Sequence, residues 1–369
     1  MNKNRRFLLA ALLAAPLVPA GWFWRNAERR NLSGWTSQQL PAASGPMRYR
    51  ELGKSGIKVS EVSFGGLQIA RQAGTDAGRA ETMRALATSE ELGCNFIDTS
   101  SVYGDSELLI GEFMPGRRDR WLISTKYSGQ HGGLEATLEN QLRRLRTDAV
   151  DIYMIHWAPS PESDHELYEA LYRVQKAGKT RLVGVSLGNI GDIRTVLSQT
   201  DIDVFMVPFN YLSPDPFVAG LDIIRDKQPA VLVRTSLIDG LLTGKFDRDH
   251  RFSDQNDHRH SWDPEIVAET VDKMQNFRFL EDVAESLTLA ATRYPLAWPE
   301  VSTVVVGTRT FTQAEENFSQ ISDGRLTPET LQQIQKLQRS LDLFDRRGRL
   351  KDGVRRLMGH LGAGEGEKQ

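Results

Sequence analysis

Cysteine is almost absent from this sequence. A chain of 369 residues contains one cysteine, Cys94, so a disulfide within the chain is excluded. Cys94 ends an apolar helical segment and has no base beside it in the sequence. A reactive thiolate needs such a neighbour, so Cys94 is predicted to be a core residue.

An excess of charge of one sign is also absent. The 46 Lys and Arg residues nearly balance 48 Asp and Glu residues and leave a net charge of -2, which argues against nucleic acid as a partner. Asp249-His250 and the Asp257 to His260 segment match no tight zinc spacing. No metal is therefore expected. Residues 246 to 262 are predicted to be a variable polar loop, which is long enough to act as a lid over the cofactor or substrate.

What the sequence does contain is a regular alternation of short apolar runs with segments of helical period. The runs are predicted to be strands at Val59 to Phe64, Asn95 to Asp98, Trp121 to Lys126, Asp151 to His156, Arg181 to Ser186, Val204 to Pro208, Val231 to Thr235 and Thr303 to Val306. Helices are predicted between them, at Arg79 to Leu92, Asp105 to Phe113 and Leu134 to Leu145 among others. This alternation predicts an α/β fold, a (β/α)8 TIM barrel in one domain over residues 47 to 344.

The first 46 residues differ in character from the rest. Residues 1 to 6 are basic, and residues 7 to 20 are apolar and uncharged and end in Val18-Pro19-Ala20, which predicts an export signal or anchor over residues 1 to 24. Arg5-Arg6 resembles a twin-arginine signal. A cleaved signal, a retained membrane anchor and an uncleaved cytoplasmic extension all stay open, and the cell envelope, periplasmic or membrane-anchored, is the expected location.

Two polar segments flank the predicted barrel. Residues 25 to 46 are predicted to be a linker. In the segment from residue 345 to 369, six basic side chains lie between residues 346 and 356 and a glycine-rich end follows, which predicts either a disordered tail or a basic contact with a membrane surface. A monomer is the simplest assumption.

Four polar residues lie at or just beyond the carboxyl ends of predicted strands, where the active sites of parallel barrels are found. They are Asp98, Tyr103, Lys126 and His156. Each alone also fits a structural role, but together they suit the reduction of a carbonyl. A tyrosine with a pKa near 10 needs a neighbouring cation to act as an acid at pH 7, and Lys126 would supply it. Asp98 would balance the buried lysine, and His156 would orient the substrate oxygen.

The segments around these residues resemble the aldo-keto reductases. Residues 47 to 60 resemble the family's opening hairpin, residues 95 to 107 its Asp and Tyr motif, residues 123 to 126 its lysine strand and residues 151 to 157 its histidine strand. The resemblance extends over residues 47 to 341. It implies reduction of a small aldehyde or ketone to an alcohol by hydride transfer from NADPH, with Tyr103 as the general acid.

The resemblance also implies a set of cofactor contacts. In the family, a loop matching residues 237 to 245 lies over the pyrophosphate, and a last-strand motif contacts the adenosine end, where Arg309 would bind a 2'-phosphate. The implied residues are Ser186 and Asn189 at the nicotinamide, Leu237, Gly240, Leu242, Gly244 and Lys245 in the loop, and Gly307, Thr308, Arg309, Gln313, Glu316 and Asn317 at the adenosine.

The sequence departs from the family pattern near the expected nicotinamide. Met206 stands where the family usually has Gln, and a thioether cannot donate a hydrogen bond to the carboxamide, so weaker cofactor binding is expected. Phe209, where the family often has Tyr, is expected to line the substrate pocket. Trp157 either walls that pocket or caps the barrel.

A second function stays open at this point. Potassium-channel beta subunits share this barrel, and this chain would resemble them if it bound a nicotinamide cofactor as a regulatory module with little turnover. The Met206 departure favours this reading, whereas the complete set of four polar residues favours an enzyme.

Overall fold

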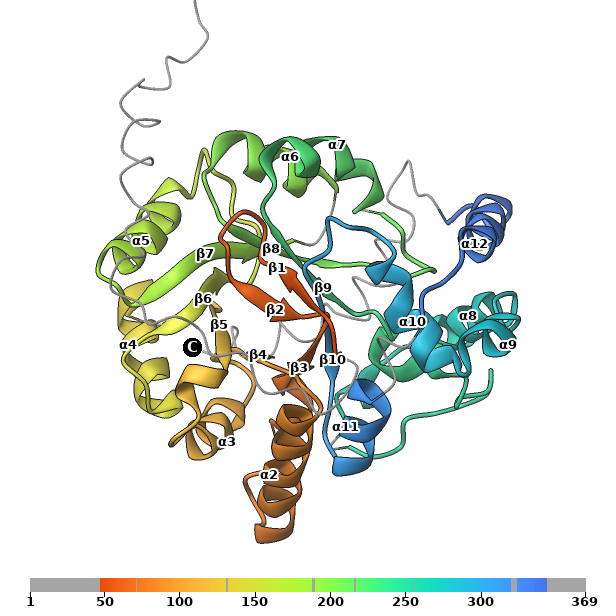
Figure 1. Cartoon of the computed structure of the whole chain (residues 1–369), viewed down its shortest axis with the longest axis horizontal. Coiled ribbons are helices and arrows are strands. Elements are labelled where there is room, and N and C mark those ends of the chain that lie inside the picture. The colour runs from red at the N-terminus through yellow and green to blue at the C-terminus, as the bar shows by residue number, and fades with distance from the viewer. Residues whose placement is uncertain are drawn as a thin grey trace, which may run out of the picture. The chain divides into compact units, whose positions relative to one another are not determined.

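Eight parallel strands form a closed barrel surrounded by helices (Figure 1), in a computed structural model that describes residues 47–70, 72–130, 132–187, 190–215, 217–255, 257–319 and 324–343. The barrel strands are β3 (Val62–Gly65), β4 (Phe96–Asp98), β5 (Leu122–Tyr127), β6 (Val150–Ile155), β7 (Thr180–Ser186), β8 (Val204–Pro208), β9 (Ala230–Arg234) and β10 (Thr303–Gly307). Each strand pairs with the next along the chain, and β10 closes the ring against β3. The predicted TIM barrel is confirmed. The predicted export segment, linker and basic tail lie outside the described residues.

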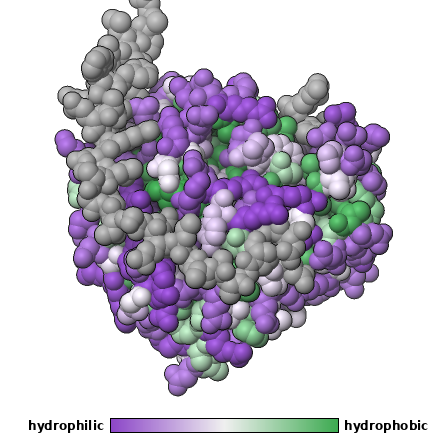
Figure 2. All heavy atoms as spheres, in the orientation of Figure 1, coloured by the Kyte–Doolittle hydropathy of each residue, from purple (hydrophilic) through white to green (hydrophobic). Residues whose placement is uncertain are grey.

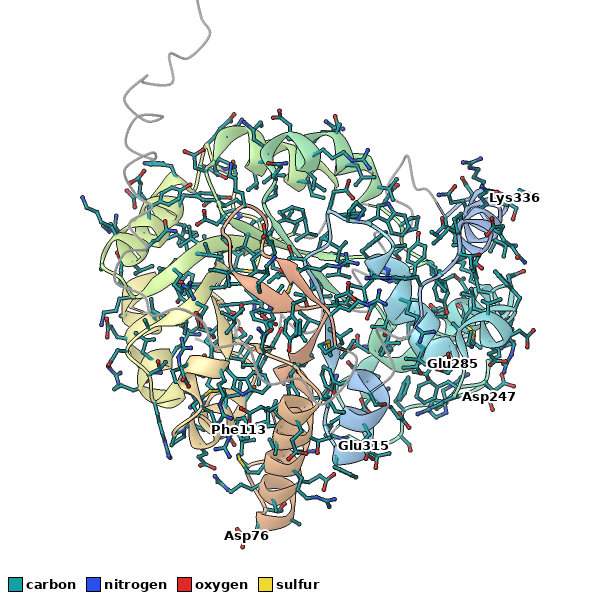
Figure 3. All side chains as sticks on the ribbon, viewed as in Figure 1. Asp76, Phe113, Asp247, Glu285, Glu315 and Lys336 are labelled. Atoms are coloured by element: carbon teal, nitrogen blue, oxygen red, sulfur yellow. The ribbon has the colours of Figure 1, made fainter. Side chains whose placement is uncertain are left out.

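The helices lie outside the barrel: α2 (Asp76–Glu91), α3 (Ser106–Phe113), α4 (Gly133–Leu145), α5 (His165–Lys176), α6 (Ile190–Gln199), α7 (Leu221–Lys227), α8 (Pro264–Gln275), α9 (Leu280–Ala284), α10 (Leu287–Leu296), α11 (Phe311–Phe318) and α12 (Pro328–Ser340). Helix α5 shows why they form, because Tyr168, Leu171 and Val174 recur at helical spacing and are all buried. Charged residues such as Asp76, Glu315 and Lys336 lie at the outer rim (Figure 3). Among the described residues, no helix has the length and apolar character needed to cross a membrane.

A two-stranded hairpin, β1 (Tyr49–Glu51) with β2 (Lys58–Ser60), lies across one end of the barrel (Figure 1). The prediction of one strand from Val59 to Phe64 is therefore wrong, since Glu61 separates β2 from β3. The backbone N–H of Glu61 donates to the Arg48 carbonyl, and its carboxylate accepts from Arg50 Nε at 2.7 Å and from Arg325 Nη2 at 2.5 Å. These bonds turn the chain between the hairpin and the barrel. Hydrophilic side chains dominate this face of the molecule among the coloured atoms (Figure 2).

The barrel interior is filled by apolar side chains from the hairpin end upward. Leu52, Ile57 and Val59 of the hairpin segment pack with inward-facing strand residues, which are Phe96, Leu122, Ile152, Met154, Leu182, Val204, Met206, Ala230 and Leu232. Alternate strand residues face outward and pack against the helices. With the hairpin end packed in this way, polar side chains gather at the carboxyl ends of the strands.

Candidate active site

Lys126 and Asp98 form a buried ion pair between neighbouring strands. The Lys126 side chain is 0% exposed, and its Nζ lies 2.6 Å from Asp98 Oδ2. The same ammonium donates to the Thr99 carbonyl at 2.7 Å. Burial raises the pKa of Asp98 and lowers the pKa of Lys126, and each charge opposes the effect of burial on the other. Since each ion compensates the other, neither can be removed without leaving a buried charge.

Tyr103 and His156 meet beside this pair. Tyr103 lies in the loop after β4, and its Oη is 3.4 Å from Nε2 of His156, which follows β6. The two rings pack edge to face with centroids 5.6 Å apart. Lys126 Nζ lies 5.3 Å from the centroid of the Tyr103 ring. The structure thus brings together all four residues that the sequence singled out.

The charges around Tyr103 and His156 set their protonation. Burial raises the pKa of Tyr103, the Asp98 carboxylate raises this pKa further, and the positive charge of Arg234 lowers it. Burial, Lys126 and Arg234 together hold the pKa of His156 well below its usual value. His156 is therefore neutral near pH 7, and Arg234 is the cation that opposes the increase in the Tyr103 pKa.

Arg234 was not expected from the sequence. It ends β9, donates to Thr235 Oγ1 at 3.2 Å and to the Leu187 carbonyl at 3.3 Å, and lines a cavity with Tyr103 and Asp98. A polar residue where an apolar run ends was the signal for Asp98 and Lys126, and the same signal marks Arg234.

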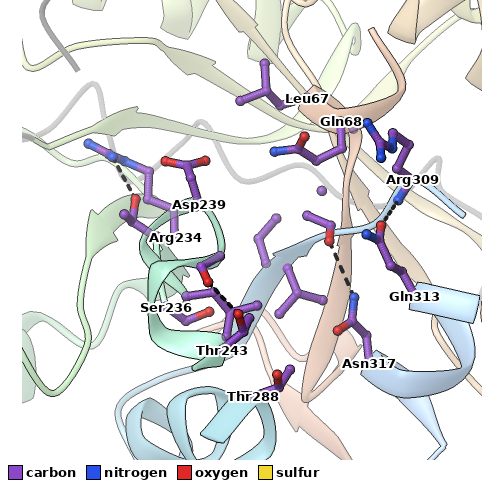
Figure 4. A pocket seen from close by; sticks show the side chains of 18 of the residues that line it. Leu67, Gln68, Arg234, Ser236, Asp239, Thr243, Thr288, Arg309, Gln313 and Asn317 are labelled. Atoms are coloured by element: carbon purple, nitrogen blue, oxygen red, sulfur yellow. Dashed lines mark hydrogen bonds between the residues drawn. The ribbon is translucent and has the colours of Figure 1, made fainter. Parts of the chain in front are cut away.

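One cavity joins the catalytic end of the barrel to helix α11. It runs from Asp98 and Tyr103 past Arg234, and many of its lining residues come from the predicted cofactor motifs: Leu237, Gly240, Lys245, Gly307, Arg309, Gln313, Glu316 and Asn317. Figure 4 shows Arg234 and Asp239 on one side of the cavity and Arg309, Gln313 and Asn317 on the other. Motifs about 70 residues apart in the sequence therefore face a common space.

The far end of the cavity is held by side-chain bonds within the last-strand motif. The Gln313 side chain accepts from the backbone N–H of Arg309 at 2.8 Å, and Asn317 Nδ2 donates to Thr308 Oγ1 at 3.0 Å. Lys245 and Glu316 face each other at 3.7 Å, each at least half exposed. Such an exposed pair contributes little to stability.

Three residues predicted at the pyrophosphate and adenosine do not line the cavity. Leu242 and Thr308 are fully buried, Leu242 in the hydrophobic core and Thr308 beneath Asn317. Gly244 adopts φ 74°, and a Cβ there would lie 2.8 Å from Leu287 Cδ1. Thr308 thus positions Asn317, and Gly244 permits a turn. These three residues shape the site rather than face its cavity.

The predicted nicotinamide contacts are only partly described. Ser186 ends β7, is buried and pairs in register with Met206 of β8. Met206 lines the cavity and is 2% exposed. Ser186 does not line the cavity, and Asn189 lies outside the described residues.

The two predicted substrate-pocket residues lie in different surroundings. Trp157 directly follows His156, is 39% exposed and packs near Tyr127, with ring centroids 5.9 Å apart. Phe209 is 0% exposed and packs against Phe217, Tyr294 and Trp298. The prediction for Phe209 is therefore corrected, because an aromatic cluster encloses it and leaves no face for a substrate.

The polar loop over residues 246 to 262 contributes a basic residue to the cavity. Arg259 lines it, donates to the Asp239 carbonyl at 2.8 Å and is held by the Asp257 carboxylate at 2.6 Å. Its guanidinium also lies 4.2 Å from the centroid of the Phe252 ring. The described residues contain no group of three His, Cys, Asp or Glu side chains that could hold a metal ion.

Comparison with known proteins agrees with this geometry. The Aldo/keto reductase family profile matches residues 61–339. "Aldo-keto reductase YhdN" of Bacillus subtilis (strain 168) is 28% identical over 67% of this chain and 77% of that protein. "L-galactose dehydrogenase" of Arabidopsis thaliana is 26% identical over 78% of this chain and 93% of that protein. The holo structure of "aldo-keto reductase AKR11C1" from Bacillus halodurans superposes with a TM-score of 0.65 at 25% identity, over 79% of this chain and 96% of that one. The chain therefore belongs to the aldo/keto reductase family and is an oxidoreductase that reduces carbonyl compounds.

Proposed function

We propose that this protein reduces aldehydes or ketones to alcohols with NADPH, and that Tyr103 is the general acid. One observation supports this proposal above the others. A single cavity is lined by Tyr103 and Asp98 at one end and by Arg309, Gln313 and Asn317 at the other. An extended dinucleotide could place its reactive ring at the first end and its adenosine at the second.

The cavity residues suit a dinucleotide. Gly65 and Gly307 pair in register at the ends of β3 and β10, and both line the cavity together with Gly66. A Cβ at Gly307 would lie 2.8 Å from Gln68 Cγ, and one at Gly65 would lie 2.9 Å from the Val306 carbonyl oxygen. The absence of a Cβ at Gly65 and Gly307 therefore lets these neighbouring residues pack closely at the wall of the cavity. When bound, NADPH supplies the hydride.

The chain's own residues then handle the proton and the developing charge. Tyr103 Oη donates its proton to the substrate oxygen, while His156 Nε2, 3.4 Å from Oη, orients that oxygen. Lys126 and Arg234 are the cations beside the phenolate that remains. Asp98 holds Lys126 in place. Each of these groups is largely buried, which strengthens their electrostatic interactions.

The experiment that tests this function is NADPH oxidation by the purified protein with a panel of aldehydes and ketones. We expect loss of NADPH absorbance to depend on the carbonyl compound and to continue through many turnovers. If no compound in the panel accelerates NADPH loss over the rate without substrate, the proposed activity is wrong.

The second candidate is a member of this family whose turnover is so low that it serves as a regulatory cofactor-binding module. Met206 favours it, because this residue lines the same cavity as Arg234, is 2% exposed, and carries a thioether that cannot donate to a carboxamide. Such a module would hold NADPH for long periods and oxidise it barely more than once per protein. Sustained turnover excludes this candidate.

Replacing Arg309 by Ala should weaken NADPH binding but not NADH binding. Arg309 is exposed and lines the cavity, and within the described part of the chain its guanidinium has no ion-pair partner. Loss of charged hydrogen bonds to a 2'-phosphate should raise the Kd of NADPH by about ten- to a hundredfold. Fluorescence titration with both cofactors measures this change.

Lys336→Ala is the matched control for Arg309→Ala. Lys336 is an exposed cation on helix α12, at the rim of the molecule (Figure 3), so its removal should leave both Kd values unchanged. If Arg309→Ala weakened NADPH and NADH binding equally, Arg309 would not recognise the 2'-phosphate.

We further propose that residues 1 to 24 direct the protein to the cell envelope, as an export signal or as an anchor. The basic head and apolar run support this proposal. A full-length chain with a C-terminal tag should appear in the envelope fractions, whereas a chain without residues 1 to 24 should remain in the cytoplasm. Replacing both Arg5 and Arg6 by Lys keeps the basic head and should shift the protein to the cytoplasm only for a twin-arginine signal. Recovery of the full-length chain in the cytoplasm would contradict the proposal.

A further inference from the structure

Two serine hydroxyls converge on the His156 nitrogen that faces away from Tyr103. Ser128 Oγ lies 2.7 Å from His156 Nδ1, and Ser100 Oγ lies 3.1 Å from the same nitrogen. The two hydroxyl oxygens are 3.2 Å apart. Nε2, on the other side of the ring, faces Tyr103 Oη at 3.4 Å. The serines are therefore placed to decide which ring nitrogen carries the proton.

In one arrangement of protons, every hydrogen-bonding atom of the two hydroxyls and of Nδ1 has a partner within this group. Ser128 donates to Nδ1 across the shortest contact, Ser100 donates to Ser128, and the Val102 N–H, 3.5 Å from Ser100 Oγ, points at its oxygen. Nδ1 is then an acceptor, so the neutral ring carries its proton on Nε2. Every hydroxyl proton has a partner in this arrangement.

The opposite tautomer fits less well. With a proton on Nδ1, one serine oxygen must accept it. The two serines can then use only one of their two hydroxyl protons between themselves, across 3.2 Å, and the other proton has no acceptor among the described residues. Ser128 is partly exposed and would direct that proton to solvent. Ser100 is 1% exposed, so it cannot take that role itself. A buried hydroxyl without an acceptor is disfavoured.

We propose that Ser100 and Ser128 are positioning residues that hold His156 as the neutral tautomer with its proton on Nε2. This inference rests on the proposed function and makes His156 a hydrogen-bond donor on the side that faces Tyr103. Its Nε2–H donates toward the substrate oxygen and Tyr103, so Nε2 does not accept the Tyr103 proton. The proton of Tyr103 is then directed to the substrate. Burial and the charges of Lys126 and Arg234 keep the ring neutral, which this assignment requires.

The proposal is tested first by nitrogen NMR of the full-length protein with 15N-labelled histidine. The seven histidines are resolved by comparison with a His156→Gln variant, which identifies the His156 signals. We expect the Nδ1 signal of an unprotonated nitrogen and the Nε2 signal of a protonated one. The reverse pattern overturns the proposal. This readout needs no substrate, so it remains valid even if the proposed reductase activity fails.

The second test relies on the ability of each serine to replace the other as the hydrogen-bond donor to Nδ1. In Ser128→Ala, Ser100 can still donate to Nδ1 from 3.1 Å, and in Ser100→Ala, Ser128 still donates from 2.7 Å. Each single variant should therefore lower kcat/KM by less than about threefold, whereas the double variant should lower it by about tenfold or more. The double variant should also show both tautomers by NMR.

A Ser128→Thr variant keeps the hydroxyl and should keep the single tautomer and the activity. Circular dichroism establishes that the double variant is folded. If the folded double variant keeps the Nε2–H tautomer alone, the serines do not control it and the proposal is wrong.

Discussion

Tyr103→Phe is expected to abolish turnover and to leave NADPH binding unchanged. The substitution removes only the Oη atom that lies 3.4 Å from His156 Nε2, while the ring still fills its place beside Lys126 Nζ. Loss of the general acid should lower kcat by about a hundred- to ten-thousandfold. Steady-state kinetics measures kcat, and fluorescence titration measures the Kd of NADPH.

Tyr127→Phe is the matched control, because Tyr127 is a neighbouring buried phenol. Its hydroxyl makes one long bond, to the Gln130 carbonyl at 3.4 Å, and it does not line the cavity. Activity of this control should stay within about twofold of the parent. Substantial turnover in Tyr103→Phe would show that another group protonates the substrate.

Lys126→Met should remove both activity and much of the stability. Methionine fills a similar volume but leaves the buried Asp98 carboxylate without the ammonium that lies 2.6 Å away. Breaking one partner of a buried pair costs about 3–5 kcal/mol. Loss of the cation beside Tyr103 should also lower kcat by at least about a hundredfold. Urea unfolding measures the free energy of unfolding.

The double variant Asp98→Asn with Lys126→Met separates these two effects. It removes the unpaired charge, so its free energy of unfolding should recover part of the loss, while its activity should remain as low as that of Lys126→Met. If the double variant were no more stable than Lys126→Met, the unpaired carboxylate would not be the cause of the instability.

Much of the fold could be predicted because each strand and helix is recognisable from its own stretch of sequence. Buried parallel strands are continuous apolar runs separated by helices of regular period, and the order of these elements implies the barrel. The break at Glu61 could not be seen in this way. Val59 to Phe64 resembles one strand in the sequence, and the turn depends on Arg50 and Arg325, which contact Glu61 from distant parts of the chain.

The active site was predictable to the extent that strand ends carry it. Asp98 ends β4, Lys126 is the next-to-last residue of β5, His156 follows β6, and Tyr103 lies in the loop after β4. A position within a motif does not say which way a side chain faces. For this reason the sequence could not show that Phe209 is enclosed by aromatic rings.

The residues that were missed depend on contacts over long distances. Arg259 reaches the cavity only because its loop folds back and its guanidinium bonds the Asp239 carbonyl, 20 residues earlier. Ser100 and Ser128 become significant only where two strand ends bring them to one nitrogen of His156. Residue type and spacing cannot indicate such a meeting point.

Transfer of deuterium from labelled NADPH tests the proposed reaction most directly. NADPH carrying deuterium at its hydride-donating carbon is incubated with the protein and an excess of an aldehyde or ketone, and mass spectrometry follows the alcohol. We predict deuterium on the former carbonyl carbon of the product, in many equivalents per protein, and almost none with Tyr103→Phe. An alcohol without deuterium, or label limited to about one equivalent per protein, would contradict catalysis by hydride transfer at this site.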